Sequence, residues 1–138
     1  MIIVIDTNVL ISALIKDSFT RRVIVGSGMN FCYPEISLHE LRKYEKLIME
    51  KSGLGRDEFD ELLEKILEYV VLIPTEVIHK HMDRAKSIML KTEPKDVVFI
   101  SVALAFDNSV IWSDDKDFDR QDTIRIIKTG QFTKLLEK

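Results

Sequence analysis

Short apolar runs alternate with amphipathic stretches along this 138-residue chain, and the alternation predicts an α/β fold. Continuous apolar, largely β-branched runs predict strands at residues 2–5, 31–33, 70–73, 110–113 and 123–127. Helical spacing of apolar residues predicts helices at residues 9–14, 19–25, 35–51, 57–69, 75–90, 94–106 and 129–136. Asp57 and Thr75 are the expected N-caps of the fourth and fifth of these helices. The order favours a parallel sheet with helices on both faces.

The composition is that of a folded chain, and it names no substrate. Hydrophobic residues make up 46% and charged residues 31%, which fits a single domain over residues 1–138. No apolar run approaches the ~20 residues that cross a bilayer, and the N-terminus lacks signal-peptide features, so a cytoplasmic location is expected. Cys32 is the only cysteine, which excludes an internal disulfide and a cysteine zinc site and favours a buried structural thiol.

Acidic residues follow several of the predicted strands. Asp6 ends the first strand, Glu40 lies in the helix after the second, Asp96 lies in the helix that Pro94 opens, and Asp115 and Asp117 follow the fourth strand. Strand ends and following helix starts share one edge of a parallel sheet, so we expect these carboxylates to converge. Clustered carboxylates repel each other unless a cation neutralises them, and oxygen ligands suit Mg²⁺ or Mn²⁺. Such a site is suited to phosphodiester hydrolysis.

Helix capping explains any one of these acids equally well, because acidic residues are favoured at helix N-termini. The group is harder to explain that way, and Asp6 in particular ends an apolar strand and must find a strong partner. The net charge of −3 decides nothing, because setting aside the five candidate acids leaves 18 acidic against 20 basic residues. A phosphate substrate is neither supported nor excluded by charge.

Four segments around these acids resemble the motifs of PIN domains. They are Val4-Ile5-Asp6-Thr7-Asn8-Val9-Leu10, Glu35-Ile36-Ser37-Leu38-His39-Glu40-Leu41, Pro94-Lys95-Asp96-Val97-Val98-Phe99-Ile100 followed by Ala103-Leu104-Ala105, and Ile111-Trp112-Ser113-Asp114-Asp115-Lys116-Asp117-Phe118. Each motif alone is weak, but their order and spacing match over nearly the whole chain.

The resemblance implies a five-stranded sheet of order 3-2-1-4-5, dependence on Mg²⁺ or Mn²⁺, and cleavage of single-stranded RNA that leaves a 5′-phosphate and a 3′-hydroxyl. It also implies roles for individual residues: Asp6, Glu40, Asp96 and Asp115 as catalytic metal ligands, directly or through water, Asp117 as an auxiliary acid in the metal site, and Asn8 and Ser113 as hydrogen-bonding supports. Many members of the family are VapC-type toxins, dimeric and inhibited by a small antitoxin, so a homodimer and such a partner are expected.

The fourth motif departs from the family pattern, because its spacer is itself acidic. Asp115 keeps the Asp-x-Asp-Phe spacing and is the preferred ligand, while Asp114 is expected to cap the following turn. Lys116 and Lys95 adjoin candidate ligands and are expected to contact RNA phosphates, and Arg21 and Arg22 are weaker candidates.

Three other functions are compatible with parts of the sequence. A catalytically silent module of the same fold, binding RNA or protein, is the main alternative, and the full set of acids argues against it. An aspartyl-phosphate phosphatase needs a second acid where Asn8 stands, and a receiver domain needs a lone Asp after a central strand and a Lys on a later strand.

The apolar stripe of residues 57–69 is explained equally well as a dimer surface or as core, whereas Trp112 is expected to lie in the core.

Overall fold

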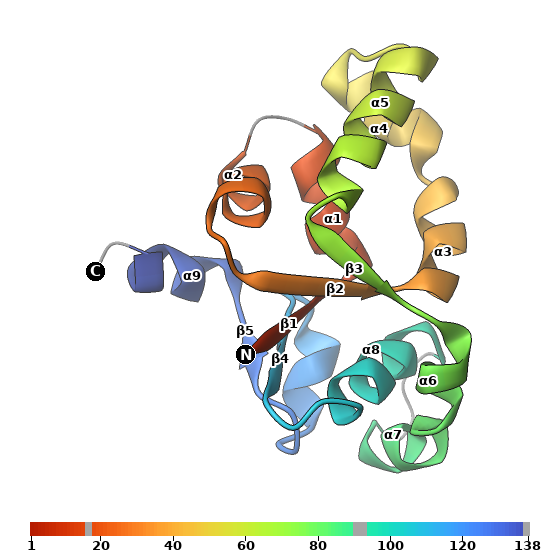
Figure 1. Cartoon of the computed structure of the whole chain (residues 1–138), viewed down its shortest axis with the longest axis vertical. Coiled ribbons are helices and arrows are strands. Elements are labelled where there is room, and N and C mark those ends of the chain that lie inside the picture. Colours follow the sequence, from red (N-terminus) through yellow and green to blue (C-terminus); the bar gives the residue numbers. More distant parts are fainter. Residues whose placement is uncertain (16–17, 90–93, 137–138) are drawn as a thin grey trace.

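A five-stranded parallel sheet forms the centre of the computed structural model, which describes residues 1–15, 18–89 and 94–136 (Figure 1). The strands are β1 (Ile2–Ile5), β2 (Asn30–Pro34), β3 (Val70–Ile73), β4 (Ser109–Trp112) and β5 (Ile126–Ile127). Their order is β3-β2-β1-β4-β5, and each neighbouring pair is parallel. The predicted fold class and strand order are confirmed.

Helices cover both faces of the sheet, as expected of strands that are apolar throughout. They are α1 (Thr7–Ile15), α2 (Phe19–Gly26), α3 (Leu38–Arg42), α4 (Glu45–Ser52), α5 (Arg56–Leu67), α6 (Thr75–His79), α7 (Met82–Ile88), α8 (Pro94–Leu104) and α9 (Thr129–Leu136), with 3₁₀ turns η1 (Glu35–Ser37) and η2 (Lys116–Arg120). In Figure 1, α1, α2, α4 and α5 lie on one side of β2 and β3, and α6, α7 and α8 lie on the other. Within the described ranges, no helix combines the length and apolarity that a membrane span requires.

The core confirms several expectations drawn from the sequence. Trp112 is fully buried, with its ring centroid 6.1 Å from that of Phe31 and 4.4 Å from that of Phe132. Its indole N–H donates to the hydroxyl of Thr129 at 2.9 Å, so the polar end of the ring is satisfied within the core. Cys32 is also buried, and burial raises the pKa of its thiol to about 12, which makes it a structural residue rather than a nucleophile.

Two predicted long helices are wrong, because each is broken into shorter pieces. Residues 35–51 form η1, α3 and α4. The break follows from Lys43 and Tyr44, whose amides bond to carbonyls three residues back and so tighten the chain into a turn. Residues 75–88 likewise divide into α6 and α7, and the predicted end at Leu90 lies outside the described residues. The helical spacing of apolar residues continues across both breaks, so this spacing could not predict them.

The predicted caps of two helices are also wrong. Helix α5 begins at Arg56 rather than after Asp57, because the Gly55 amide donates to the side chain of Glu58 at 3.3 Å and fixes an earlier start. Thr75 is the first residue of α6 and its side chain makes no capping hydrogen bond, since Pro74 takes the N-cap position.

Strand β5 is shorter than predicted, with two residues in place of residues 123–127. The side chain of Gln121 explains the difference. Its amide donates to the carbonyls of Phe118 and Ile124, and its oxygen accepts from the Ile124 amide. These bonds hold the preceding residues in a loop and delay their entry into the sheet.

Candidate metal centre

Four of the predicted acids line one small pocket where β1 and β4 end. This carboxylate pocket is lined by Asp6, Thr7, Asn8, Glu40, Tyr44, Lys95, Asp96, Phe99 and Asp115. Its volume is about 80 Å³. That is several times the roughly 10–15 Å³ that one water needs, so the pocket has room for a cation with some of its hydration shell. The convergence predicted from strand ends is therefore present in the folded chain.

Three carboxylates come closest together. Asp96, Asp115 and Asp117 each offer one oxygen, and these oxygens all lie within 4.8 Å of one another. Two oxygens bound to the same Mg²⁺ at about 2.1 Å lie at most about 4.2 Å apart, so small side-chain movements suffice for all three to bind one ion. The donor set is oxygen only, which fits Mg²⁺ or Mn²⁺ and gives no reason to expect zinc. Asp117 thus belongs with the central acids rather than at their margin.

Asp6 is held rigidly at the end of β1. One carboxylate oxygen accepts a hydrogen bond from the Val9 amide at 2.8 Å, which caps α1, and the other accepts from the buried hydroxyl of Ser113. Capping and site geometry are therefore compatible, because a carboxylate has about four acceptor positions and these bonds use two. Burial raises the pKa of Asp6 to about 6 against the opposing effect of Ser113 and Val9, and the nearby Asp115 charge adds to the rise.

Asp96 lies in the first turn of α8 and is 93% buried. Burial is the main cause that raises its pKa to about 6, and the charges of Asp115 and Asp117 raise it further, while Lys95 lowers it. Its carboxylate accepts no hydrogen bond within the described part of the chain. A buried carboxylate with acidic neighbours and so little compensation is unstable in its ionised form, and a bound cation would relieve it.

The adjacent acids Asp114 and Asp115 have different surroundings. Asp115 accepts the Asp117 amide at 2.9 Å and so caps η2, and its second oxygen has no such partner among the described residues. Asp114 accepts the amide of Thr129 at 2.8 Å and its hydroxyl at 2.6 Å, which satisfies the first N–H of α9. The expectation that Asp114 caps the following turn is therefore wrong, because Asp115 does so and Asp114 reaches a helix 15 residues further on.

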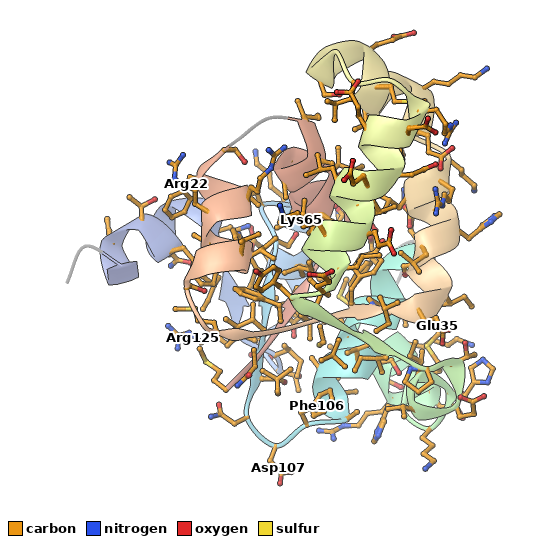
Figure 2. The ribbon with its side chains drawn as sticks, turned by 45° about the horizontal axis from the view of Figure 1, so that its top comes forward. Arg22, Glu35, Lys65, Phe106, Asp107 and Arg125 are labelled. Carbon is orange, nitrogen blue, oxygen red and sulfur yellow. The ribbon has the colours of Figure 1, made fainter. Side chains whose placement is uncertain are left out.

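The predicted phosphate-binding residues divide into two groups. Lys95 lines the carboxylate pocket with its ammonium 3.8 Å from Glu40, and exposed Lys116 opens η2 beside the acids. Arg21 and Arg22 lie elsewhere, on α2 in a groove against α5, and the Arg21 guanidinium donates to the carbonyl of Ala13 at 2.7 Å. Figure 2 shows Arg22 on α2 and Lys65 on α5. Of the four, Lys95 lines the carboxylate pocket, and Lys116 adjoins Asp115 and Asp117 in the sequence.

Sequence reasoning missed the residues that align the pocket walls. The Tyr33 hydroxyl donates to the Ser37 carbonyl at 2.9 Å and lies 2.8 Å from the Thr7 hydroxyl, which therefore donates to it. These bonds join the end of β2 to the start of α1 and to the turn that precedes Glu40. A tyrosine within an apolar strand was the available signal, because a buried hydroxyl needs a partner. Tyr44, which also lines the pocket, had no such signal.

Comparison with known proteins identifies the class. The family model described as the PIN domain matches residues 4–129, so the chain belongs to the PIN-domain family. Among solved structures, it is similar to one described as VapBC2 from Rickettsia felis bound to a DNA fragment from their promoter. The TM-score is 0.65 at 18% identity, and the match covers 93% of this chain and 98% of that one. At this identity the likeness concerns the fold. A search of curated proteins gave no significant match.

Proposed function

We propose that this protein is a Mg²⁺- or Mn²⁺-dependent endoribonuclease that hydrolyses phosphodiester bonds of single-stranded RNA. The observation that carries the proposal is the group of Asp96, Asp115 and Asp117 oxygens within 4.8 Å of one another, beside a pocket that Asp6 and Glu40 also line. Membership of the PIN-domain family supports it. Five acids around one pocket, with Asp6 and Asp96 buried, are costly to a fold unless they bind a cation.

Each acid has a part that follows from its position. Asp96, Asp115 and Asp117 would bind the cation directly, and Asp6 and Glu40 would bind it directly or through water. Ser113 and the Val9 amide hold the Asp6 carboxylate in one orientation, as supporting groups do at metal sites. Asn8, exposed at the pocket wall, can donate a hydrogen bond to a water or to the substrate. When bound, the divalent cation supplies Lewis-acid chemistry that activates water and offsets charge on the phosphate.

We expect the substrate to approach past Lys95, which lines the pocket, and Lys116, which adjoins Asp115 in the sequence. Lys95 is half-exposed and Lys116 is exposed, so both can reach the phosphates that flank the cleaved bond. We expect products with a 5′-phosphate and a 3′-hydroxyl, as the family resemblance implies. End-group analysis of a cleaved oligonucleotide checks this directly.

The test replaces Asp6 and Asp96 separately with Asn. We expect Mn²⁺-supported cleavage of single-stranded RNA to disappear in both variants and in wild type with EDTA, while circular dichroism stays native. The control is Asp107→Asn, an exposed acid labelled in Figure 2, which precedes β4 and so lies at the opposite end of that strand from Asp115. Undiminished cleavage by both pocket variants would refute the proposal.

The main alternative is a catalytically silent module that binds RNA or protein through the same fold. Calorimetry separates the two. A nuclease site should bind Mn²⁺ in wild type and lose that binding in Asp96→Asn, whereas a silent module would show RNA binding that EDTA does not change.

We also propose a small antitoxin-type partner, as the structure of VapBC2 from Rickettsia felis suggests by its fold. The groove between α2 and α5, lined by Arg21, Arg22, Val25, Gly26, Leu62, Lys65 and Ile66, has a volume of about 550 Å³. The described residues of this lining include three cationic side chains, no acid, and the apolar side chains of Val25, Leu62 and Ile66. An amphipathic segment with acidic residues would complement it.

The test needs a short reading frame directly upstream of this gene, whose protein product is co-expressed with this chain. Leu62→Arg should abolish co-purification with that protein without changing Mn²⁺ affinity. Leu47→Arg is the matched control, because Leu47 is 41% exposed on α4 and does not line the groove. Equal loss in both variants would argue against the groove.

A homodimer, which the family resemblance implies, stays a prediction. Burial of Phe59, Leu63 and Ile66 within this chain favours core packing over a dimer surface for these residues of the α5 stripe. Sedimentation equilibrium at micromolar concentration measures the oligomeric state.

A further inference from the structure

A second pocket adjoins the carboxylate pocket. This hydroxyl pocket is lined by Asn8, Val9, Ser12, Thr20, Asp114, Asp115 and Thr129, and its volume is about 210 Å³. It shares Asn8 and Asp115 with the carboxylate pocket, so the two hollows meet at these residues. An RNA strand bound at the carboxylates can therefore continue into the hydroxyl pocket along the protein surface.

The walls of the hydroxyl pocket come from three helices. Asn8 and Ser12 are four residues apart on α1 and so lie on one face of that helix. Thr20 lies on α2, and Thr129 begins α9. Thr129 is already engaged, because its hydroxyl donates to Asp114 and accepts from Trp112.

Other polar groups in the pocket remain available to a ligand. Within the described ranges, the side chains of Asn8, Ser12 and Thr20 form no hydrogen bond. The Asp114 carboxylate accepts two bonds and has further acceptor positions. The pocket thus offers an amide, two hydroxyls and a carboxylate to whatever enters it.

These groups favour a sugar or a base over a phosphate. Among the described residues that line the pocket there is no Lys or Arg, and Asp114 and Asp115 would repel a phosphate. An uncharged ribose has hydroxyl donors for Asp114, and a base edge has both donors and acceptors for the Asn8 amide. The volume lies below the roughly 300–1,000 Å³ of sites that enclose a whole small molecule, which suits one unit of a longer strand.

We infer that the hydroxyl pocket binds the sugar and base of one nucleotide next to the cleaved phosphate. The inference rests on the proposed nuclease function and adds a positioning element to it. The nucleotide held there fixes which phosphate lies over the acids, so Asn8, Ser12 and Thr20 select the position of cleavage. Ser12 is the clearest probe, since it is exposed and its side chain supports no other residue of the described chain.

The experiment fills the pocket with Ser12→Tyr and compares Ser87→Tyr, an exposed helical serine on α7 that lines neither pocket. In Ser12→Tyr we expect the KM for a single-stranded RNA to rise by about 10-fold, the scale of losing one base contact, with unchanged Mn²⁺ affinity. Ser87→Tyr should match wild type. Thr20→Val, which removes one hydroxyl at constant size, should raise KM in the same direction by a smaller factor.

A substrate series gives a second readout. Oligonucleotides with one abasic nucleotide, moved stepwise through the cleavage site, should lose cleavage by wild type at one position, and Ser12→Tyr should abolish that positional effect. Equal KM values in Ser12→Tyr and Ser87→Tyr, with an unchanged abasic profile, overturn the hydroxyl pocket but leave the nuclease intact. A wild-type protein that binds Mn²⁺ but cleaves no RNA overturns the proposed function, and the inference with it.

Discussion

Two groups of acidic side chains in the described part of the chain have opposite surroundings. On α4 and α5, Glu45 contacts Arg42 at 2.5 Å and Arg56 at 3.1 Å, and Asp60 lies 3.7 Å from both arginines. The hydrogen bond from Arg42 is the main cause that lowers the pKa of Glu45. In the carboxylate pocket, burial and neighbouring acids raise the pKa values of Asp6 and Asp96 to about 6.

The difference lies in where the compensating charge comes from. In the arginine network of Arg42, Glu45, Arg56 and Asp60, the chain supplies its own cations, and nothing further is needed for stability. The described residues that line the carboxylate pocket include four acids and one cation, Lys95, whose ammonium lies 3.8 Å from Glu40. A cluster of acids that lacks basic partners indicates that a cation binds from solution. The number of acidic residues in a sequence does not indicate this, because those acids can be paired as Glu45 is.

The largest effect is expected when the adjacent acids Asp114 and Asp115 are replaced one at a time. Asp115→Asn should weaken Mn²⁺ binding by at least about 100-fold, because its carboxylate lies in the central group. Asp114→Asn should leave Mn²⁺ affinity within about twofold and lower the stability by about 1 kcal/mol, because Asp114 holds the start of α9. Calorimetry and urea unfolding measure the two effects. The reverse pattern would make Asp114 the ligand.

Mn²⁺ affinity should depend steeply on pH. Protons compete with the cation for carboxylates whose pKa is about 6, so each such carboxylate costs about 10-fold in affinity between pH 7 and pH 5. For Asp6 and Asp96 together the loss is about 100-fold. Titration calorimetry at several pH values measures it, with Glu45→Gln as a variant that should keep the wild-type slope. A flat profile would show that neither acid binds the cation.

Without metal, the stability of the folded chain should change with pH in the opposite direction. Because the pKa values of Asp6 and Asp96 are raised above the ordinary 3.8, their contribution to stability is full below that value and is lost as pH rises through about 6. Urea unfolding in EDTA should therefore show a gain of about 1 kcal/mol per carboxyl between pH 7 and pH 5. Asp96→Asn should halve this dependence, and excess Mn²⁺ should reverse its sign.

The arginine network should show the smallest effect. Glu45→Gln should destabilise the protein by less than about 1 kcal/mol at pH 7, because the network is partly exposed and solvent screens it. Its lowered pKa gives the opposite sign to the pocket, since its contribution is present at neutral pH and is lost only in acid. Thermal unfolding at low and high salt measures this loss of stability. A loss well above 1 kcal/mol would contradict the expectation that solvent screens the network.

The fold was largely readable from the sequence, because buried parallel strands are apolar throughout and their order followed from the family resemblance. The convergence of Asp6, Glu40, Asp96 and Asp115 was readable for the same reason, since strand ends meet at one edge. The helix breaks at Lys43 and at Lys80 were not readable, because a 3₁₀-like turn keeps the apolar phase of the helices that flank it.

Finer details of the site depended on side-chain partners that sequence spacing does not encode. Asp117 belongs to the central group of acids because of the geometry of η2, a short turn whose N-cap is Asp115. The partner of Asp114 lies 15 residues away, on a helix whose docking depends on the packing of Trp112. Local motifs name the acids in such a cluster, but tertiary contacts decide which of them face the pocket.

The three residues after β4 also determine when the centre can form during synthesis. Ser113 holds Asp6, which lies 107 residues earlier, Asp114 holds α9, and Asp115 lies beside the pocket. A growing chain that has released only its first strands therefore has the first acid but neither its hydroxyl partner nor the later carboxylates. Translation must therefore pass beyond β4 to Asp117 before all the acids of the carboxylate cluster are present, when most of the polypeptide has been made.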